Sequence, residues 1–125
     1  MSKKERVLSW ILLVLCAAPI LTAVVGVQFL PDQIPVHYNV AGEIDRWGSK
    51  YEELVLGVCF SLSGWILWLV SRFSGAFADT ETERVQARAN AHIVRVIGIA
   101  VQLFLTVLEV VMLIGAAQEA AAGAV

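Results

Sequence analysis

The sequence predicts an all-α integral membrane protein, a three-helix bundle with an ordered extracellular loop between its first two helices. Hydrophobic residues make up 58% of the 125 residues and charged residues only 16%, and the mean hydropathy is +0.75. A membrane-spanning helix needs about 20 apolar residues. Three segments meet that need, at about residues 7–30, 54–73 and 93–117, and we expect a single membrane domain over residues 1–125.

The first segment follows Lys3, Lys4 and Arg6, as the apolar core of a secretory signal peptide would. Such a core spans roughly 7 to 15 residues. Residues 7–30 contain no Lys, Arg, His, Asp or Glu and are longer than that. We therefore expect an uncleaved first helix.

The positively charged residues predict the orientation, because Lys and Arg are retained on the cytoplasmic side. Seven of the nine lie before the first segment or around residues 72–95, and only Arg46 and Lys50 lie in the loop at residues 31–53. This distribution predicts a cytoplasmic N-terminus, an extracellular loop at residues 31–53, a cytoplasmic connection at residues 74–92 and an extracellular C-terminus.

The loop at residues 31–53 is the one polar, turn-rich stretch between two apolar segments. Pro31 and Pro35 restrict the backbone, and Asn39 and Gly42 favour a turn, so we expect the loop to be ordered. A connection of this length without secondary structure is uncommon unless it binds something or is disordered. The residues predicted to bind a ligand or to hold the loop in shape are Pro35, His37, Tyr38, Asn39, Gly42, Asp45, Trp47 and Lys50.

Metal binding and catalysis have weak support in this loop. His37, Glu43 and Asp45 are candidate metal ligands, but the loop has no second histidine and no cysteine, which zinc sites prefer. A hydrogen bond between the histidine and an aspartate, and an Asp–Lys ion pair, are the favoured roles for these side chains. The sequence lacks a nucleophile elbow and a phosphate-binding glycine loop. We expect no enzyme activity, no metal, no cofactor and no nucleic-acid partner.

The two cysteines are predicted to be unpaired core residues. Counted along their helices, Cys16 and Cys59 lie at depths that differ by roughly 13 Å. A disulfide needs Cα atoms within about 7 Å.

A helix is predicted to start near Thr80 and to continue into the third segment. Thr80 and Glu83 have the spacing of a capping box. Arg84, Arg88 and Arg95 share one face of this helix. That face is an anchor for anionic lipid headgroups or a docking surface for a cytosolic partner. His92, between them, is expected to be solvated.

Glu109 lies within the third segment, and Gln102 and Thr106 share its helical face. Ionisable groups at such depth are costly and mark functional sites. One alternative is a protonated carboxyl that is hydrogen-bonded to Gln28, Gln102 or a serine of the second segment. The other is a proton or cation site beneath the loop, with Lys50 or Arg46 as its counter-charge.

A motif in the loop resembles a known family. Leu30-Pro31, Ile34-Pro35, His37-Tyr38-Asn39, Gly42, Asp45, Gly48 and Lys50 follow one another between two spans. Over roughly residues 8–60 the chain resembles the domain of unknown function 1648 (DUF1648), the N-terminal part of SdpI-type immunity proteins. The resemblance implies a multi-pass protein of the bacterial plasma membrane that is related to toxin-immunity factors. The further membrane-spanning half of full-length immunity proteins does not follow here.

These observations favour a non-enzymatic membrane protein that senses, or confers immunity to, an extracellular peptide or envelope component. The arginine face would then contact a cytosolic regulator. The alternative is a small transporter or channel subunit that uses Glu109 and forms a homo-oligomer. An enzyme with His37 and Asp45 as acid and base is the least favoured interpretation.

Overall fold

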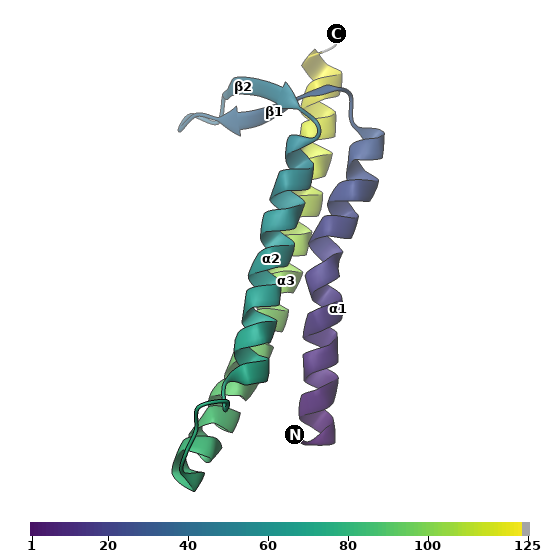
Figure 1. The fold of residues 1–125 in the computed structure, drawn as a ribbon. Coiled ribbons are helices and arrows are strands. Elements are labelled where there is room, and N and C mark those ends of the chain that lie inside the picture. The colour runs from purple at the N-terminus through teal and green to yellow at the C-terminus, as the bar shows by residue number, and fades with distance from the viewer. Residues whose placement is uncertain (124–125) are drawn as a thin grey trace.

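The structure is a computed structural model that describes residues 1–123 and contains three long helices and one β-hairpin (Figure 1). The last two residues of the predicted domain, 124 and 125, lie outside the described residues. The elements, in order, are α1 (Lys3–Gly26), the 3-10 turn η1 (Val27–Phe29), β1 (Gln33–Tyr38), β2 (Ile44–Ser49), α2 (Glu52–Phe73) and α3 (Glu81–Gly123).

The helices run side by side, and the hairpin lies across one end of the bundle, beside the end of α3 (Figure 1). We call this the hairpin end. The opposite end holds the start of α1 and the connection between α2 and α3. We call it the arginine end, because Arg72, Arg84, Arg88 and Arg95 lie there around one cavity.

The outward faces of the helices are apolar. Large hydrophobic side chains are more than half exposed on every helix, among them Trp10 on α1, Trp65 on α2 and Phe104 on α3. Each helix is long and apolar enough to cross a membrane. Exposed apolar surface of this extent is rare on soluble monomers. The predicted arrangement of three spans therefore agrees with the structure, which is that of a multi-pass membrane protein.

The helices pack with a seven-residue period, which keeps the contact faces of near-parallel helices together. On α1 the buried residues include Ser9, Cys16 and Ala23. The buried faces of α2 and α3 repeat at the same interval, with small residues on α2 opposite long polar ones on α3. The facing pairs are Gly57 with Glu109, Gly64 with Gln102, and Ser71 with Arg95.

The glycines in this ladder are required by the close approach of the helices. A Cβ on Gly57 would lie 2.6 Å from the Ala23 Cβ and 3.1 Å from Glu109 Oε1. A Cβ on Gly64 would lie 2.6 Å from the Gln102 Cδ. Small residues that let helices approach closely are typical of membrane bundles.

The start of α3 confirms the predicted capping box. The backbone N–H of Glu83 donates to Thr80 Oγ1 at 3.1 Å, and Glu83 Oε2 accepts from the N–H groups of Thr80 and Asp79. These bonds hold the pKa of the exposed Glu83 carboxyl below its usual range, with the Asp79 N–H as the largest cause. The helix then runs unbroken through Gly98, as predicted.

The predicted all-α class is wrong in the loop, because residues 33–49 form an antiparallel β-hairpin. Pro35, which was expected to restrict the backbone of an ordered loop, lies within β1. Proline is tolerated in an edge strand, and both strands of this sheet are edges. Ile34, Val36 and Tyr38 alternate with Pro35 and His37, and this period of two was the signal for a strand.

The base of the hairpin is anchored to the bundle by apolar contacts. Leu30 and Ile34 form a buried cluster with Leu113 and Ala116 of α3, and Val36 packs against it. The hairpin therefore has a fixed position over the end of the bundle.

Both cysteines are free, as predicted, but only Cys16 is a core residue. Cys59 is exposed on the outward face of α2. The prediction that both pack in the core is therefore wrong for Cys59.

Candidate functional site

The tip of the hairpin is shaped by Asn39. Its Oδ1 accepts hydrogen bonds from the N–H groups of Ala41 and Glu43 at 3.0 and 2.9 Å. Gly42 has a φ of 82°, a left-handed conformation that glycine adopts without strain. Asn39 Nδ2 also donates to the Glu43 carboxylate at 3.4 Å. Glu43 thus faces Asn39, and the proposed metal ligands do not come together as a set of three.

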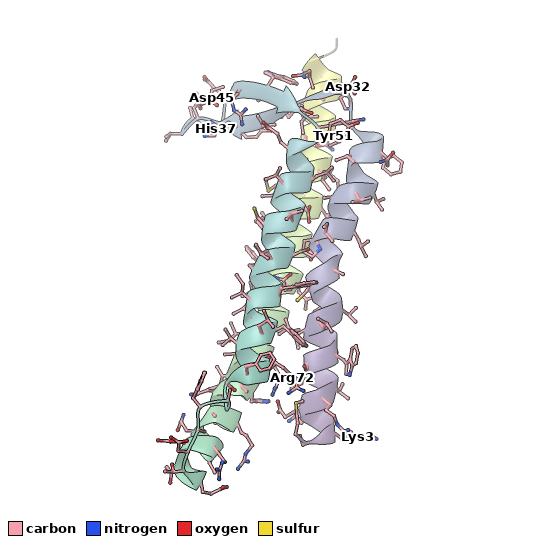
Figure 2. The ribbon with its side chains drawn as sticks, in the orientation of Figure 1. Lys3, Asp32, His37, Asp45, Tyr51 and Arg72 are labelled. Carbon is pink, nitrogen blue, oxygen red and sulfur yellow. The ribbon has the colours of Figure 1, made fainter. Side chains whose placement is uncertain are left out.

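His37 and Asp45 face each other across the two strands (Figure 2). His37 Nδ1 lies 2.5 Å from Asp45 Oδ1, and the two side chains are 64% and 41% exposed. The predicted hydrogen bond between a histidine and an aspartate of this loop is therefore present. The pair stands at the surface, where a ligand can reach it.

The root of the hairpin is held by two ion pairs. Arg46 donates two hydrogen bonds of 3.4 Å to the carboxylate of Glu52. Lys50 Nζ lies 3.7 Å from Asp32 Oδ1, and the N–H of Lys50 donates to the Asp32 carbonyl. Lys50 therefore takes part in an Asp–Lys pair. Trp47 packs against the end of α3, where a Cβ on Gly123 would lie 3.2 Å from its ring.

A groove of about 740 Å³ lies between the hairpin and the adjoining ends of α2 and α3. Its lining combines charged, aromatic and apolar side chains, including His37, Tyr38, Arg46, Glu52, Leu56 and Met112. Pro35, His37 and Tyr38 are thus the predicted ligand-binding residues that line it. A groove with charges of both signs above an apolar floor has the chemistry to hold an extended peptide.

Glu109 and Gln102 point into the bundle, as predicted, and both are 0% exposed. Gln102 Nε2 donates to the Phe60 carbonyl at 3.1 Å and to Ser63 Oγ at 3.2 Å. Thr106 is half-buried and donates to the Gln102 carbonyl at 2.8 Å, so it serves its own helix.

Both carboxylate oxygens of Glu109 lack a hydrogen-bond partner within residues 1–123. The predicted hydrogen bond from Gln28, Gln102 or a serine is therefore wrong. Gln28 donates to the Val24 carbonyl instead. The counter-charges proposed for Glu109 are engaged elsewhere, Arg46 with Glu52 and Lys50 with Asp32.

Glu53 was not singled out from the sequence, yet it is only 8% exposed and its Oε2 has no partner among the described residues. It lies one turn from Gly57 on α2 and lines the groove. Glu53 precedes the apolar segment by one residue, but nothing in the sequence distinguishes it from its neighbour Glu52. Glu52 faces solvent and forms the ion pair with Arg46.

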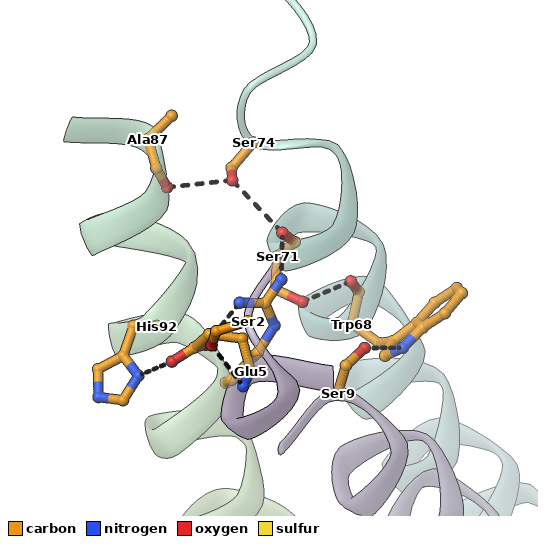
Figure 3. A network of polar contacts seen from close by, with 9 residues as sticks. Ser2, Glu5, Ser9, Trp68, Ser71, Ser74, Ala87 and His92 are labelled. Atoms are coloured by element: carbon orange, nitrogen blue, oxygen red, sulfur yellow. Dashed lines mark hydrogen bonds and ion pairs between the residues drawn. The ribbon is translucent and has the colours of Figure 1, made fainter. Parts of the chain in front are cut away.

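The arginine end contains a network that the sequence did not predict (Figure 3). Arg95 Nη1 donates to Glu5 Oε2 at 2.7 Å, and Nη2 donates to the Ser71 carbonyl at 3.2 Å. His92 Nδ1 lies 2.6 Å from Glu5 Oε1, so His92 is paired and not simply solvated. Glu5 thereby joins α1 to α3.

The charge of Glu5 is stabilised by these two partners. Partial burial is the largest single influence and raises the pKa of its carboxyl. The hydrogen bonds from His92 and Arg95 and their charges together lower the pKa by more than burial raises it, so the pKa lies below its ordinary value. Glu5 is therefore an anion held by two donors of α3.

Arg84, Arg88 and Arg95 lie on one side of α3, in keeping with their spacing, but they are not equally exposed. Arg84 and Arg88 are exposed and both approach Glu81, at 3.6 and 3.4 Å, whereas Arg95 is 5% exposed inside the bundle. All three nevertheless line the same cavity.

The hairpin and its flanking helices correspond to a domain already defined by sequence. Residues 14–62 match DUF1648, a domain of unknown function. The matched DUF1648 segment contains the second half of α1, the whole hairpin and the first half of α2. This agrees with the predicted resemblance and leaves α3 outside the match.

An uncharacterized protein of Archaeoglobus fulgidus is similar to part of the chain, with 37% identity over 43 residues. Those residues are 34% of this chain and 24% of that protein, so the match spans about a quarter of the relative's length. No solved structure is significantly similar to this protein.

Proposed function

We propose that the protein is a non-enzymatic plasma-membrane protein that recognises an extracellular peptide, and that the groove beneath the hairpin is its binding site. One observation carries this proposal: the polar residues of the DUF1648 motif build a rigid hairpin over a groove of about 740 Å³. Sensing of the peptide, or immunity to it, is the biological role that we propose. The resemblance to SdpI-type immunity proteins supports this role.

The orientation is part of the proposal and has its own test. Val40 at the hairpin tip and Phe77 in the connection between α2 and α3 are fully exposed side chains at opposite ends of the molecule. We expect a membrane-impermeant maleimide to label Val40→Cys in intact cells and Phe77→Cys only after the cells are permeabilised. The opposite pattern would show that the hairpin faces the cytoplasm.

Immunity is tested by survival of cells that are exposed to antibacterial peptides. Tyr38 at the end of β1 and Tyr51 just after β2 are matched, because both are exposed tyrosines but only Tyr38 lines the groove. We expect the chain and its Tyr51→Ala variant to protect cells, and Tyr38→Ala to protect them less. Identical killing curves with and without the chain, for every peptide tried, would refute immunity.

A second candidate function, a homo-oligomeric transporter or channel subunit, is favoured by Glu109. Its two oxygens are buried without a partner within residues 1–123, and intramembrane acids are typical of ion and proton pathways. Ion or proton flux into liposomes that contain the protein should fall with Glu109→Gln. Equal flux for the two proteins would argue against this function.

A further inference from the structure

The arginine end contains a second cavity, remote from the hairpin. It has a volume of about 340 Å³ and lies where the start of α1 meets the end of α2 and the first turns of α3. Its lining includes Ser2, Glu5, Arg72, Arg84, Arg88 and Arg95. Four arginines thus line one space, and Glu5 is the one carboxylate residue in that lining.

We propose that this cavity binds the phosphate of an anionic phospholipid headgroup. Guanidinium groups match phosphate oxygens in geometry and charge. The cavity also adjoins the N-terminus of α1, because its capping residue Ser2 lines the wall. A helix N-terminus attracts anions through its free N–H groups and its dipole.

Arg95 supplies the buried donor of this site. The residue is 5% exposed, its two Nη atoms bond Glu5 and the Ser71 carbonyl, and its Nε is buried without a partner within residues 1–123. A buried donor without an acceptor is costly, more so on a charged group. Arg95 lines the cavity, and a shift of its side chain toward a bound phosphate would let Nε donate to a phosphate oxygen.

The other three arginines carry more positive charge than the protein neutralises. Arg84 and Arg88 share one carboxylate, that of Glu81, at 3.6 and 3.4 Å. Arg72 has no ion pair among residues 1–123, and its guanidinium lies 6.0 Å from the centre of the Phe73 ring. All three side chains are exposed and are able to reorient toward a bound anion.

The position of the cavity favours a lipid over a soluble anion. It lies just beyond the apolar parts of the helices, at the level where the lipid-facing surface gives way to polar residues. Trp10, which is 66% exposed, and Phe77, which is 95% exposed, project from the surface near this level. Aromatic side chains with one face in lipid are typical of the membrane interface. Headgroup phosphates occupy this zone.

The test is lipid binding to the purified full chain in a neutral detergent, measured by native mass spectrometry with phosphatidylglycerol and phosphatidylcholine. We expect phosphatidylglycerol to bind more tightly by at least about fivefold, because both lipids carry a phosphate but the arginines repel the choline cation of phosphatidylcholine, and one unit charge a few Å away in water has an effect of this size. Arg72→Gln and Arg88→Gln should each remove most of this preference. Both residues are exposed, so these variants are expected to fold.

Lys4→Gln is the matched control, because Lys4 is an exposed cation at the same end that does not line the cavity. The control should keep the preference for phosphatidylglycerol. Equal affinity for the two lipids, or an equal loss in Lys4→Gln, would overturn the proposal. Displacement of the lipid by millimolar inorganic phosphate would assign the cavity to a soluble anion, and selective binding of an acidic peptide would assign it to a protein partner.

Discussion

The two ends of the molecule use the same chemical groups in opposite ways. At each end a histidine contacts a carboxylate and an arginine contacts a glutamate. At the hairpin end the partners are 8 and 6 residues apart, as in His37–Asp45 and Arg46–Glu52, and all four side chains are at least 41% exposed. At the arginine end both donors bind Glu5 from 87 and 90 residues away, and the Arg95 side chain is only 6% exposed.

This difference separates contacts that shape a loop from contacts that join helices. An exposed pair between neighbours in sequence restricts few conformations and is weakened by water and salt. A pair that spans the chain and excludes water holds α1 against α3, and its loss leaves a buried charge without a partner. The comparison predicts that equivalent substitutions at the two ends have unequal effects.

The largest expected effect is that of Glu5→Leu, because it leaves the Arg95 guanidinium buried without its carboxylate. We expect a loss of about 3 kcal/mol in the free energy of unfolding, the lower end of the range for broken buried pairs. The matched substitution Glu52→Leu removes the exposed partner of Arg46 and should cost less than about 1 kcal/mol. Unfolding in mixed detergent micelles, titrated with a denaturing detergent, measures both values.

Equal losses for Glu5→Leu and Glu52→Leu would contradict the distinction between the ends. Arg95→Met serves as a second variant, because it removes the buried charge together with its need for a partner. We expect Arg95→Met to cost less than Glu5→Leu. The reverse order would mean that Glu5 stabilises the bundle through contacts other than the ion pair.

The same difference explains which features the sequence could predict. The spans, the capping box at Thr80 and the His–Asp contact depend on residues that are close in sequence, where helical spacing or a turn dictates the geometry. The pairing of Glu5 with His92 and Arg95 depends on how α1 docks against α3. No local pattern encodes that docking.

The burial of Glu53 was missed for a similar reason. Glu52 and Glu53 are adjacent and identical in type, and only the direction of α2 relative to the bundle decides that Glu53 turns inward. The strands were missed because the prolines and the turn residues Asn39 and Gly42 were interpreted as an ordered loop, whereas packing of Ile34 on Leu113 and Ala116 favours the extended backbone. Tertiary contacts thus overrode the local preference.

A smaller effect is expected from Asn39→Ala, which removes the acceptor for two N–H groups at the hairpin tip. The substitution should destabilise the hairpin by about 1 kcal/mol, the value of a lost capping interaction. Hydrogen exchange should then quicken about fivefold for amides in β1 and β2 and stay unchanged in α1 and α3. Val40→Ala, at an exposed position beside it, is the control that should change neither region. Faster exchange throughout the bundle would show that the hairpin and the helices unfold together.

The smallest effect is expected from acid, and its direction follows from Glu5. Because the folded protein holds the pKa of Glu5 below its ordinary value of 4.5, its charge stabilises the fold fully at pH values above the unfolded pKa. That contribution is lost as the pH falls through the folded pKa. The thermal midpoint of unfolding should therefore drop below about pH 4.5, and Glu5→Gln should flatten this part of the pH profile. The exposed Asp45→Asn variant at the hairpin end, which is weakly coupled to its partner by the same reasoning, should retain the wild-type slope. If Asp45→Asn flattened the profile and Glu5→Gln did not, the pH-sensitive contacts would lie at the hairpin end. The acid stability of the bundle would then not depend on the charge of Glu5.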